Sequence, residues 1–259
     1  MRIGINATSL NDRPSGAKNR FLGIYKTMFK KMHMHSFFIY QSQDCDMKSW
    51  FNGIENITLI TVPCKSTSRI SRFIAHFTFW GRELKSKQFD LLESLNQPIV
   101  RNTFSSGVTI STIYDIRGSK EGSVIRRLLY RSFIKSTLQK SDVIITISET
   151  IKSEILALKK HENIKVVGCG ILSKIASIEK KSELFREFSK RDFILSVGHL
   201  EERKNYVFLI KAFYELSKDM PNKHLVIIGN DNGGKVKLKS LIKKLKLNEK
   251  VTMLENITD

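Results

Sequence analysis

The sequence predicts an α/β protein built from two parallel-sheet units. Two observations lead to this prediction. Short apolar segments of strand length alternate with segments whose apolar residues recur at helical spacing, and a polar, charged stretch separates two such series. Short apolar strands alternating with helices are typical of βαβ units, in which parallel strands are buried. With 259 residues the chain is long enough for two domains.

The first series fills residues 1–172 and is expected to form one Rossmann-like domain. A polar loop over residues 11–16 follows its first strand. The expected strands are Ile3–Ile5, Ser36–Tyr40, Ile57–Val62, Val108–Ile113, Asp142–Ile147 and Val166-Val167. The expected helices carry apolar residues at Phe21, Ile24, Tyr25 and Met28, and at Ile125, Leu128, Leu129 and Phe133. Ser148 is expected to cap a third helix that begins near Glu149.

The second series follows an expected linker over residues 173–190 and fills residues 191–259. Its expected strands are Phe193–Val197, Leu225–Ile228 and Val251–Leu254. Its expected helices carry Leu209, Ala212, Phe213 and Leu216, then Leu238, Leu241, Ile242 and Leu245. Two of the strands end at glycines, Gly198 and Gly229. Ligands of such folds bind at the carboxyl ends of strands, so the loops after these glycines are candidate binding sites.

The loop after Gly198 contains two adjacent cations, Arg203 and Lys204. They are expected at the start of a helix, where the helix dipole disfavours a cation by about 0.3–1 kcal/mol. We therefore expect an anion to neutralise them. A diphosphate fits, because arginine offers a planar fork of donors and lysine a point charge. The alternative is that both are solvated cations on an already basic surface.

The chain is strongly basic, with 44 Lys and Arg against 25 Asp and Glu and a net charge of +19. This charge predicts an anionic partner: nucleic acid, an acidic membrane surface or a phosphorylated substrate. Basic residues gather in segments 65–87, 123–140 and 235–250, and aromatic residues interleave the first of these. Such a segment can lie on an anionic lipid surface, line an acceptor groove or contact nucleic-acid phosphates. A solvated, lysine-rich face is the alternative.

Metal and redox chemistry have little support in the sequence. The three cysteines, Cys45, Cys64 and Cys169, are far apart and form no C-x-x-C pair, which favours a reducing cytoplasm over a disulfide framework. A single D-x-D occurs at Asp44 and Asp46, a pattern common by chance. We therefore expect no cofactor and no metal. No apolar run of about 18 residues predicts a membrane-spanning helix.

Several blocks of the sequence resemble glycosyltransferase family 4, whose members are retaining, mannosyltransferase-like group 1 enzymes with the GT-B fold. Residues 194–213 look like the donor-site signature of that family. Further blocks follow the family order: Asp12–Gly16, Thr112–Ile116, Ser141–Glu149 and Leu225–Gly229. Each block is weak alone, and together they are specific.

The resemblance implies transfer of a sugar from a nucleoside-diphosphate sugar to a glycan or lipid-linked acceptor, in polysaccharide or lipopolysaccharide assembly. It implies that Arg203 and Lys204 stabilise the charge on the β-phosphate without an obligatory metal. The implied donor-binding residues also include Gly16, Gly198 and Gly229. The implied acceptor-side residues are Tyr114, Asp115, Ser148 and Glu149, with Asp115 also catalytic.

Two departures from the family pattern are visible. Tyr114 stands where the family usually has histidine, and a phenol stays neutral at pH 7. The family's nucleotide domain normally continues well past the position of Asp259, so the resemblance implies a C-terminally truncated chain with an incomplete second domain and uncertain activity.

The expected location is cytoplasmic and peripheral at the inner face of the membrane, with no nucleic-acid partner. The alternative function is a basic nucleic-acid- or membrane-binding protein without catalysis.

Overall fold

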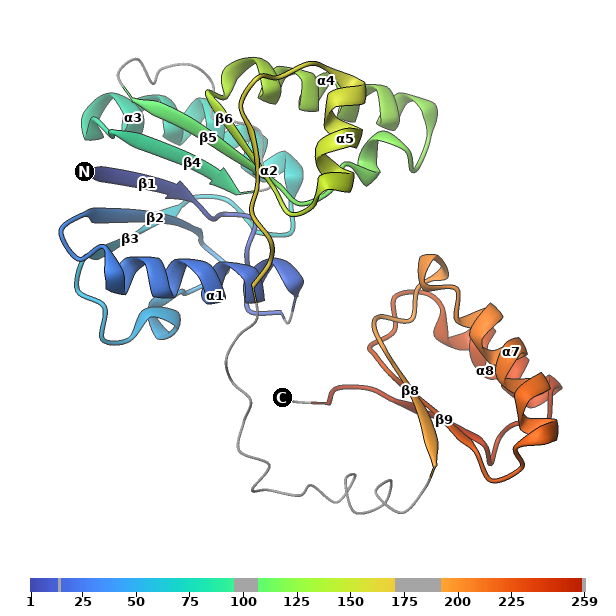
Figure 1. The fold of residues 1–259 in the computed structure, drawn as a ribbon. Helices are drawn as coiled ribbons and strands as arrows, with labels where there is room; N and C mark the ends of the chain where they lie inside the picture. Colours follow the sequence, from blue (N-terminus) through green and yellow to red (C-terminus); the bar gives the residue numbers. More distant parts are fainter. Residues whose placement is uncertain (14, 96–106, 171–191, 258–259) are drawn as a thin grey trace. The chain divides into compact units, whose positions relative to one another are not determined.

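The computed structural model describes residues 1–13, 15–95, 107–170 and 192–257. The chain divides into two compact units, Met1–Lys174 and Ile175–Asp259 (Figure 1). Each unit holds a parallel sheet flanked by helices, so the α/β prediction is confirmed. The predicted linker, residues 173–190, lies outside the described residues.

The first unit contains a seven-stranded parallel sheet with the order β3-β2-β1-β4-β5-β6-β7. Its strands are β1 (Arg2–Asn6), β2 (Ser36–Ser42), β3 (Ile57–Val62), β4 (Leu91–Leu95), β5 (Val108–Ile113), β6 (Val143–Thr146) and β7 (Ile164–Val166). All the predicted strands occur, with ends shifted by up to two residues, and β4 is an addition to them. The order reverses between β1 and β4, and ligands of doubly wound sheets bind beside such a point.

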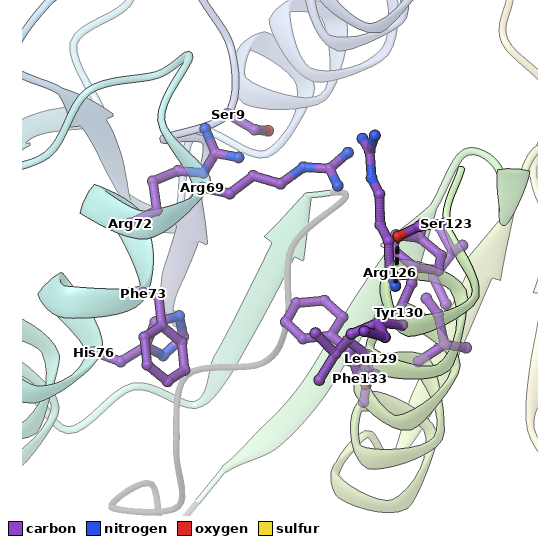
Figure 2. A pocket seen from close by; sticks show the side chains of 14 residues that line it. Ser9, Arg69, Arg72, Phe73, His76, Ser123, Arg126, Leu129, Tyr130 and Phe133 are labelled. Carbon is purple, nitrogen blue, oxygen red and sulfur yellow. Dashed lines mark hydrogen bonds between the residues drawn. The ribbon is translucent and has the colours of Figure 1, made fainter. Parts of the chain in front are cut away.

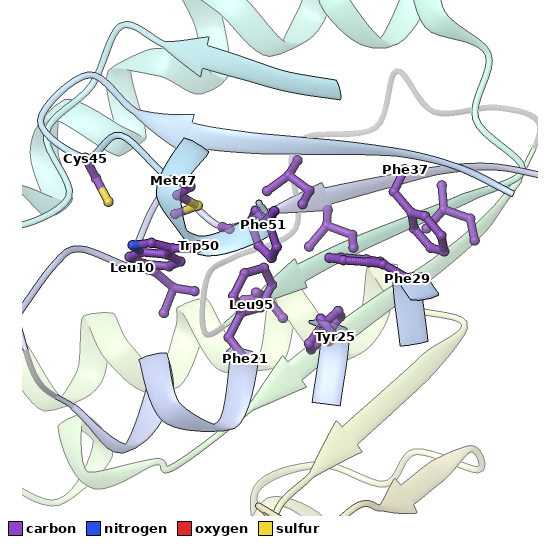
Figure 3. Close-up of a cluster of buried hydrophobic side chains, with 14 residues drawn as sticks. Leu10, Phe21, Tyr25, Phe29, Phe37, Cys45, Met47, Trp50, Phe51 and Leu95 are labelled. Carbon is purple, nitrogen blue, oxygen red and sulfur yellow. The ribbon is translucent and has the colours of Figure 1, made fainter. Parts of the chain in front are cut away.

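Helices cover both faces of this sheet. Helix α1 (Gly16–Lys31) lies on one face, and the other elements named here lie on the opposite face (Figure 1). Those elements are α2 (Arg69–Ala75), η2 (His76–Trp80), α3 (Gly81–Lys87), α4 (Val124–Lys140) and α5 (Glu149–Leu158). Under α1, Phe21, Phe29 and Phe37 pack with the short helix η1 (Lys48–Phe51) in an aromatic core (Figure 3). This core holds α1 against the sheet along most of the length of the helix.

Helix α4 forms as predicted, but its most apolar face is not buried in the core. Ile125, Leu128 and Leu129 are 73 %, 59 % and 67 % exposed. The core is instead contacted by Ile134 and Leu138, one to three turns further along the helix. The apolar start of α4 is therefore available to a ligand or partner.

The second unit contains a three-stranded parallel sheet with the order β10-β9-β8. Its elements are β8 (Phe193–Val197), η4 (Glu202–Lys204), α7 (Tyr206–Asp219), β9 (His224–Ile228), α8 (Lys235–Lys244) and β10 (Val251–Leu254). Helices α7 and α8 lie on the same face of the sheet (Figure 1). On the other face, Leu195 and Val197 are 51 % and 68 % exposed.

Across the described parts of both units, every helix is too short or too polar to cross a bilayer.

Candidate functional site

The predicted glycines Gly198 and Gly229 meet where β8 and β9 end. Gly198 has a φ of +153°, which side chains rarely adopt. A Cβ atom on Gly229 would lie 1.8 Å from the carbonyl oxygen of Gly198, so position 229 accommodates only glycine. The Tyr206 hydroxyl donates a hydrogen bond to the same carbonyl oxygen at 2.8 Å. The two glycines thus bring two backbones together at the carboxyl edge of the second sheet.

Arg203 and Lys204 lie in the short 3₁₀ turn η4, one residue before α7. Asn205 separates them from α7 and has a left-handed φ of 51°. The two cations therefore lie before α7, and not in its first turn, where the sequence pattern predicts them. Arg203 forms an ion pair with Glu201. Lys204 has no ion pair within the described part of the chain, and its ammonium lies 3.6 Å from the position of a Cβ on Gly198.

Glu201 therefore occupies the fork of Arg203 in this structure. Partial desolvation opposes ionisation of Glu201, but the hydrogen bond and charge of Arg203 outweigh it and lower the pKa of this carboxyl group. Asn232 also donates a hydrogen bond to Glu201, at 3.1 Å. An anionic ligand at Arg203 has to compete with this carboxylate, whereas Lys204 interacts with Glu201 through its charge without a described ion pair.

The neighbouring loop is organised by Asp231. Its carboxylate accepts hydrogen bonds from the backbone N–H groups of Gly233, Gly234 and Lys235, at 3.0–3.1 Å. These bonds satisfy the free donors at the start of α8. The loop after Gly229, which the sequence marks as a candidate binding site, is thus a turn that caps α8.

In the first unit, Gly16 is the exposed first residue of α1. Ser15 caps this helix, because its hydroxyl accepts a hydrogen bond from the Lys18 N–H at 3.2 Å. A Cβ on Gly16 would meet nothing within 4 Å, so the space beside it is open. The start of α1 presents backbone N–H groups that favour an anion.

Tyr114, which follows β5, packs against the buried Arg20 of α1. The guanidinium carbon of Arg20 lies 5.5 Å from the centre of the tyrosine ring. The Tyr114 hydroxyl is buried, and it has no hydrogen-bond partner among the described residues. Burial raises the pKa of Tyr114 to about 12, although Arg20 opposes the rise. Tyr114 is therefore a neutral group at neutral pH.

Beneath Arg20 lies a buried carboxyl group, Glu93 of β4. It accepts hydrogen bonds from the Tyr25 hydroxyl and the Thr112 hydroxyl, both at 2.5 Å. Burial raises the pKa of Glu93 despite these bonds and the charge of Arg20. The Nε and Nη1 atoms of Arg20 are buried without a described partner, and Nη2 donates to the Val167 carbonyl at 3.3 Å. This network gave no signal in the sequence.

The other predicted acceptor-side residues lie at two separate corners. Asp115 forms a 2.8 Å ion pair with Arg117. Ser148 caps α5 by accepting a hydrogen bond from the Ile151 N–H at 3.3 Å, and Glu149 pairs with Lys152 at 3.5 Å. Each of these groups already has a partner within its own corner.

A pocket of about 530 Å³ lies between α2 and α4 in the first unit (Figure 2). Its lining residues include three arginines, Arg69, Arg72 and Arg126, and a group of rings that includes His76 and Tyr130. The sequence marks the two basic segments, 65–87 and 123–140, but not that they face each other. Nor did it single out Ser9 and His76, which also line this pocket.

The described residues contain no group of three or more His, Cys, Asp and Glu side chains that could hold a metal ion. Asp44 of the D-x-D pattern accepts hydrogen bonds from the Ser66 N–H and hydroxyl, at 2.7 and 3.0 Å. Its role in the structure is to fix the loop before α2.

The chain is similar to a known family model and to curated proteins. Residues 177–259 match the family model "Glycosyl transferases group 1". An uncharacterised glycosyltransferase of Methanocaldococcus jannaschii is 32 % identical over 148 residues, which are 54 % of this chain and 35 % of that protein. A Campylobacter jejuni protein, N-acetylgalactosamine-N,N'-diacetylbacillosaminyl-diphospho-undecaprenol 4-alpha-N-acetylgalactosaminyltransferase, is 35 % identical over 129 residues, 49 % of this chain and 33 % of that protein.

Among solved structures, that of Anabaena Alr3699/HepE in complex with UDP and glucose is similar, with a TM-score of 0.68 and 16 % identity. The similarity covers 98 % of this chain and 69 % of that one, and it concerns the fold. The chain spans about a third of the length of the curated relatives it matches. Residues 177–259 therefore resemble group 1 glycosyltransferases, and the fold of the chain is similar to that of Alr3699/HepE.

Proposed function

We propose that this chain takes part in moving a sugar from a nucleoside-diphosphate sugar to a glycan or lipid-linked acceptor, with retained anomeric configuration, as in family 4. The observation that carries the proposal is the position of the group 1 match. It contains the loop from Gly198 to Lys204, where two glycines and two cations meet at the carboxyl edge of a parallel sheet. The acceptor of the Campylobacter jejuni relative carries diphospho-undecaprenol, which supports a lipid-linked acceptor in cell-surface glycan assembly.

In this proposal, η4 holds the diphosphate of the donor. When the bond between the sugar and the β-phosphate breaks, negative charge develops on the leaving diphosphate, and nearby cations stabilise it. Lys204 provides an ammonium beside Gly198, and Arg203 exchanges its bond to Glu201 for phosphate oxygens. These two cations provide charge stabilisation that does not require a metal ion.

The remaining proposed residues belong to the first unit. Gly16 offers exposed backbone N–H groups to donor phosphates, and Asp115 is the proposed catalytic group on the acceptor side. Tyr114, being neutral, is proposed to donate a hydrogen bond rather than a proton. Ser148 and Glu149 are proposed to border the acceptor.

A binding titration with UDP and GDP tests the donor site. We expect saturable binding to at least one nucleotide, weakened about tenfold or more in Arg203→Ala and in Lys204→Ala, since a hydrogen bond to a charged group contributes about 1.5–3 kcal/mol. Lys211→Ala is the matched control, because Lys211 is exposed on α7 of the same unit. Equal affinities in all four proteins, or no binding of either nucleotide, would contradict the proposal.

A further inference from the structure

We propose that the pocket between α2 and α4 binds a lipid whose head group is a phosphate or diphosphate. The head group lies at the three arginines, and the lipid chain lies along the apolar side chains of the two helices. Figure 2 shows the guanidinium groups of Arg69, Arg72 and Arg126 at one end of the pocket, with Phe73, Tyr130 and other rings at the opposite end.

The charged end of the pocket is purely cationic. No Asp or Glu is among the described residues that line it. Burial lowers the pKa of Arg72 and the charge of Arg69 adds to this effect, although Cys64 and the carboxylate of Asp44, outside the pocket lining, oppose it. His76 contributes no positive charge, because burial and the charge of Lys140 lower its pKa to about 4. Three guanidinium groups in a pocket whose described lining holds no carboxylate favour an anion with several oxygens, which phosphate and diphosphate provide.

Two of the arginines are held in place by neighbouring groups. Arg72 donates a hydrogen bond to the Ser66 carbonyl, and Asp44 in turn fixes the loop of Ser66. The guanidinium of Arg69 reaches across from α2 to lie 6.0 Å from the centre of the Tyr130 ring on α4. Because these side chains are already oriented, less conformational entropy is lost when an anion binds.

The apolar end continues onto the exposed surfaces of both helices. Large apolar side chains there are 52–74 % exposed: Ile70, Phe73, Ile74 and Phe77 on α2 and η2, and Val124, Ile125, Leu128 and Leu129 on α4. Contiguous exposed apolar side chains of this kind mark a binding surface. A nucleic acid would match the arginines but not these aliphatic side chains, whereas a lipid phosphate matches both.

The pocket also lies beside the proposed acceptor corner. Ser9 lines it, and its hydroxyl donates to the Leu95 carbonyl at 3.1 Å, where β1 and β4 end. The Tyr130 hydroxyl donates to the Asp115 carbonyl at 3.4 Å. A volume of about 530 Å³ is typical of ligand pockets, which span about 300–1,000 Å³. The bound lipid is then the sugar acceptor. This last step rests on the proposed function, whereas lipid binding itself does not.

The test is a binding titration without nucleotide, with geranylgeranyl diphosphate as the probe and geranylgeraniol, inorganic diphosphate and phosphatidylglycerol vesicles as comparisons. The double variant Arg69→Ala/Arg126→Ala removes two exposed arginines and leaves Arg72 in place. Arg82→Ala/Lys135→Ala is the matched control, because both residues are exposed cations outside the lining of the pocket. Leu129→Ser shortens the apolar wall, and circular dichroism establishes that each variant is folded.

We expect the probe to bind at least about tenfold more weakly to the arginine double variant than to the wild type or the control. We expect Leu129→Ser to weaken binding of the probe but not of inorganic diphosphate. Equal binding of inorganic diphosphate and the probe would indicate a free-phosphate site and overturn the lipid assignment. Vesicle binding that survives in the double variant, without binding of the probe, would indicate a general membrane surface and overturn it too. A failure of the UDP and GDP titration, which tests the donor site in the second unit, would not change the outcome of the lipid experiment.

Discussion

Gly229→Ala tests whether the two glycines meet at the edge of the second sheet. The new Cβ would lie 1.8 Å from the Gly198 carbonyl oxygen, against an ordinary contact of 3.4 Å, so the backbones would have to separate by 1.6 Å. The obstacle is backbone, and the Gly198 N–H is itself bonded to the Ile228 carbonyl at 2.8 Å. Overpacking costs about 1–3 kcal/mol. Because backbone cannot rotate away, we expect the upper half of that range.

For a unit of this size, each kcal/mol moves the unfolding midpoint by about 4–8 °C. We therefore expect the second unit to unfold about 10–20 °C lower in Gly229→Ala. Thermal unfolding followed by far-ultraviolet circular dichroism measures this change. Tryptophan fluorescence follows the first unit separately, because both tryptophans, Trp50 and Trp80, lie there.

Gly16→Ala is the matched control, since a Cβ at Gly16 meets nothing within 4 Å. This variant is expected to unfold like the wild type in both measurements. If Gly229→Ala also unfolds like the wild type, the close approach at Gly198 does not exist, and the reasoning about this edge of the sheet is refuted.

Three further predictions concern the first unit, whose stability within the full chain is followed by tryptophan fluorescence. Tyr25→Phe removes a donor from the buried Glu93 carboxyl group, so urea unfolding followed by tryptophan fluorescence should show a loss of about 1–3 kcal/mol, and an unchanged midpoint would contradict the network. Burial lowers the pKa of His76 from 6.5 to about 4, so as the pH falls the unfolded state binds a proton before the folded state does. The stability of the first unit that depends on His76 is therefore complete above pH 6.5 and is lost as the pH falls from 6.5 to 4. An NMR titration that gives His76 a pKa of 6.5 in the folded protein would contradict this. Ser148→Ala should cost about 1 kcal/mol because α5 loses its cap, whereas Ser148→Asp should retain most of the stability; equal losses would contradict the capping role.

Local patterns in the sequence were sufficient to predict most of the fold. The strands whose residues are uniformly apolar or β-branched were all predicted, because burial on both faces selects such residues. Strand β4 was missed because its centre is Glu93, a residue that normally excludes a buried strand. It is tolerated here because Tyr25 and Thr112, which are distant in the sequence, donate hydrogen bonds to it.

The candidate site shows the same division between local and long-range information. The glycines at the ends of β8 and β9 were visible in the sequence, because strand ends and glycines are local features. The exact turn that carries Arg203 was not, because the left-handed Asn205 ends η4 before α7 begins. The pocket could not be predicted as a unit, since α2 and α4 meet only through the fold of the sheet. The apolar face of α4 suggested a core contact, and the structure shows it exposed.

The central claim is that a nucleoside diphosphate binds at the carboxyl edge of the second sheet. The most direct test is photocrosslinking with an azido analogue of whichever nucleotide binds, UDP or GDP, followed by mass-spectrometric mapping of the labelled peptides. The account predicts labelling within the loops that follow β8, β9 and β10, competed by an excess of the unmodified nucleotide and reduced in Arg203→Ala but not in Lys211→Ala. Labelling confined to the first unit, or labelling that an excess of the unmodified nucleotide does not reduce, would contradict it.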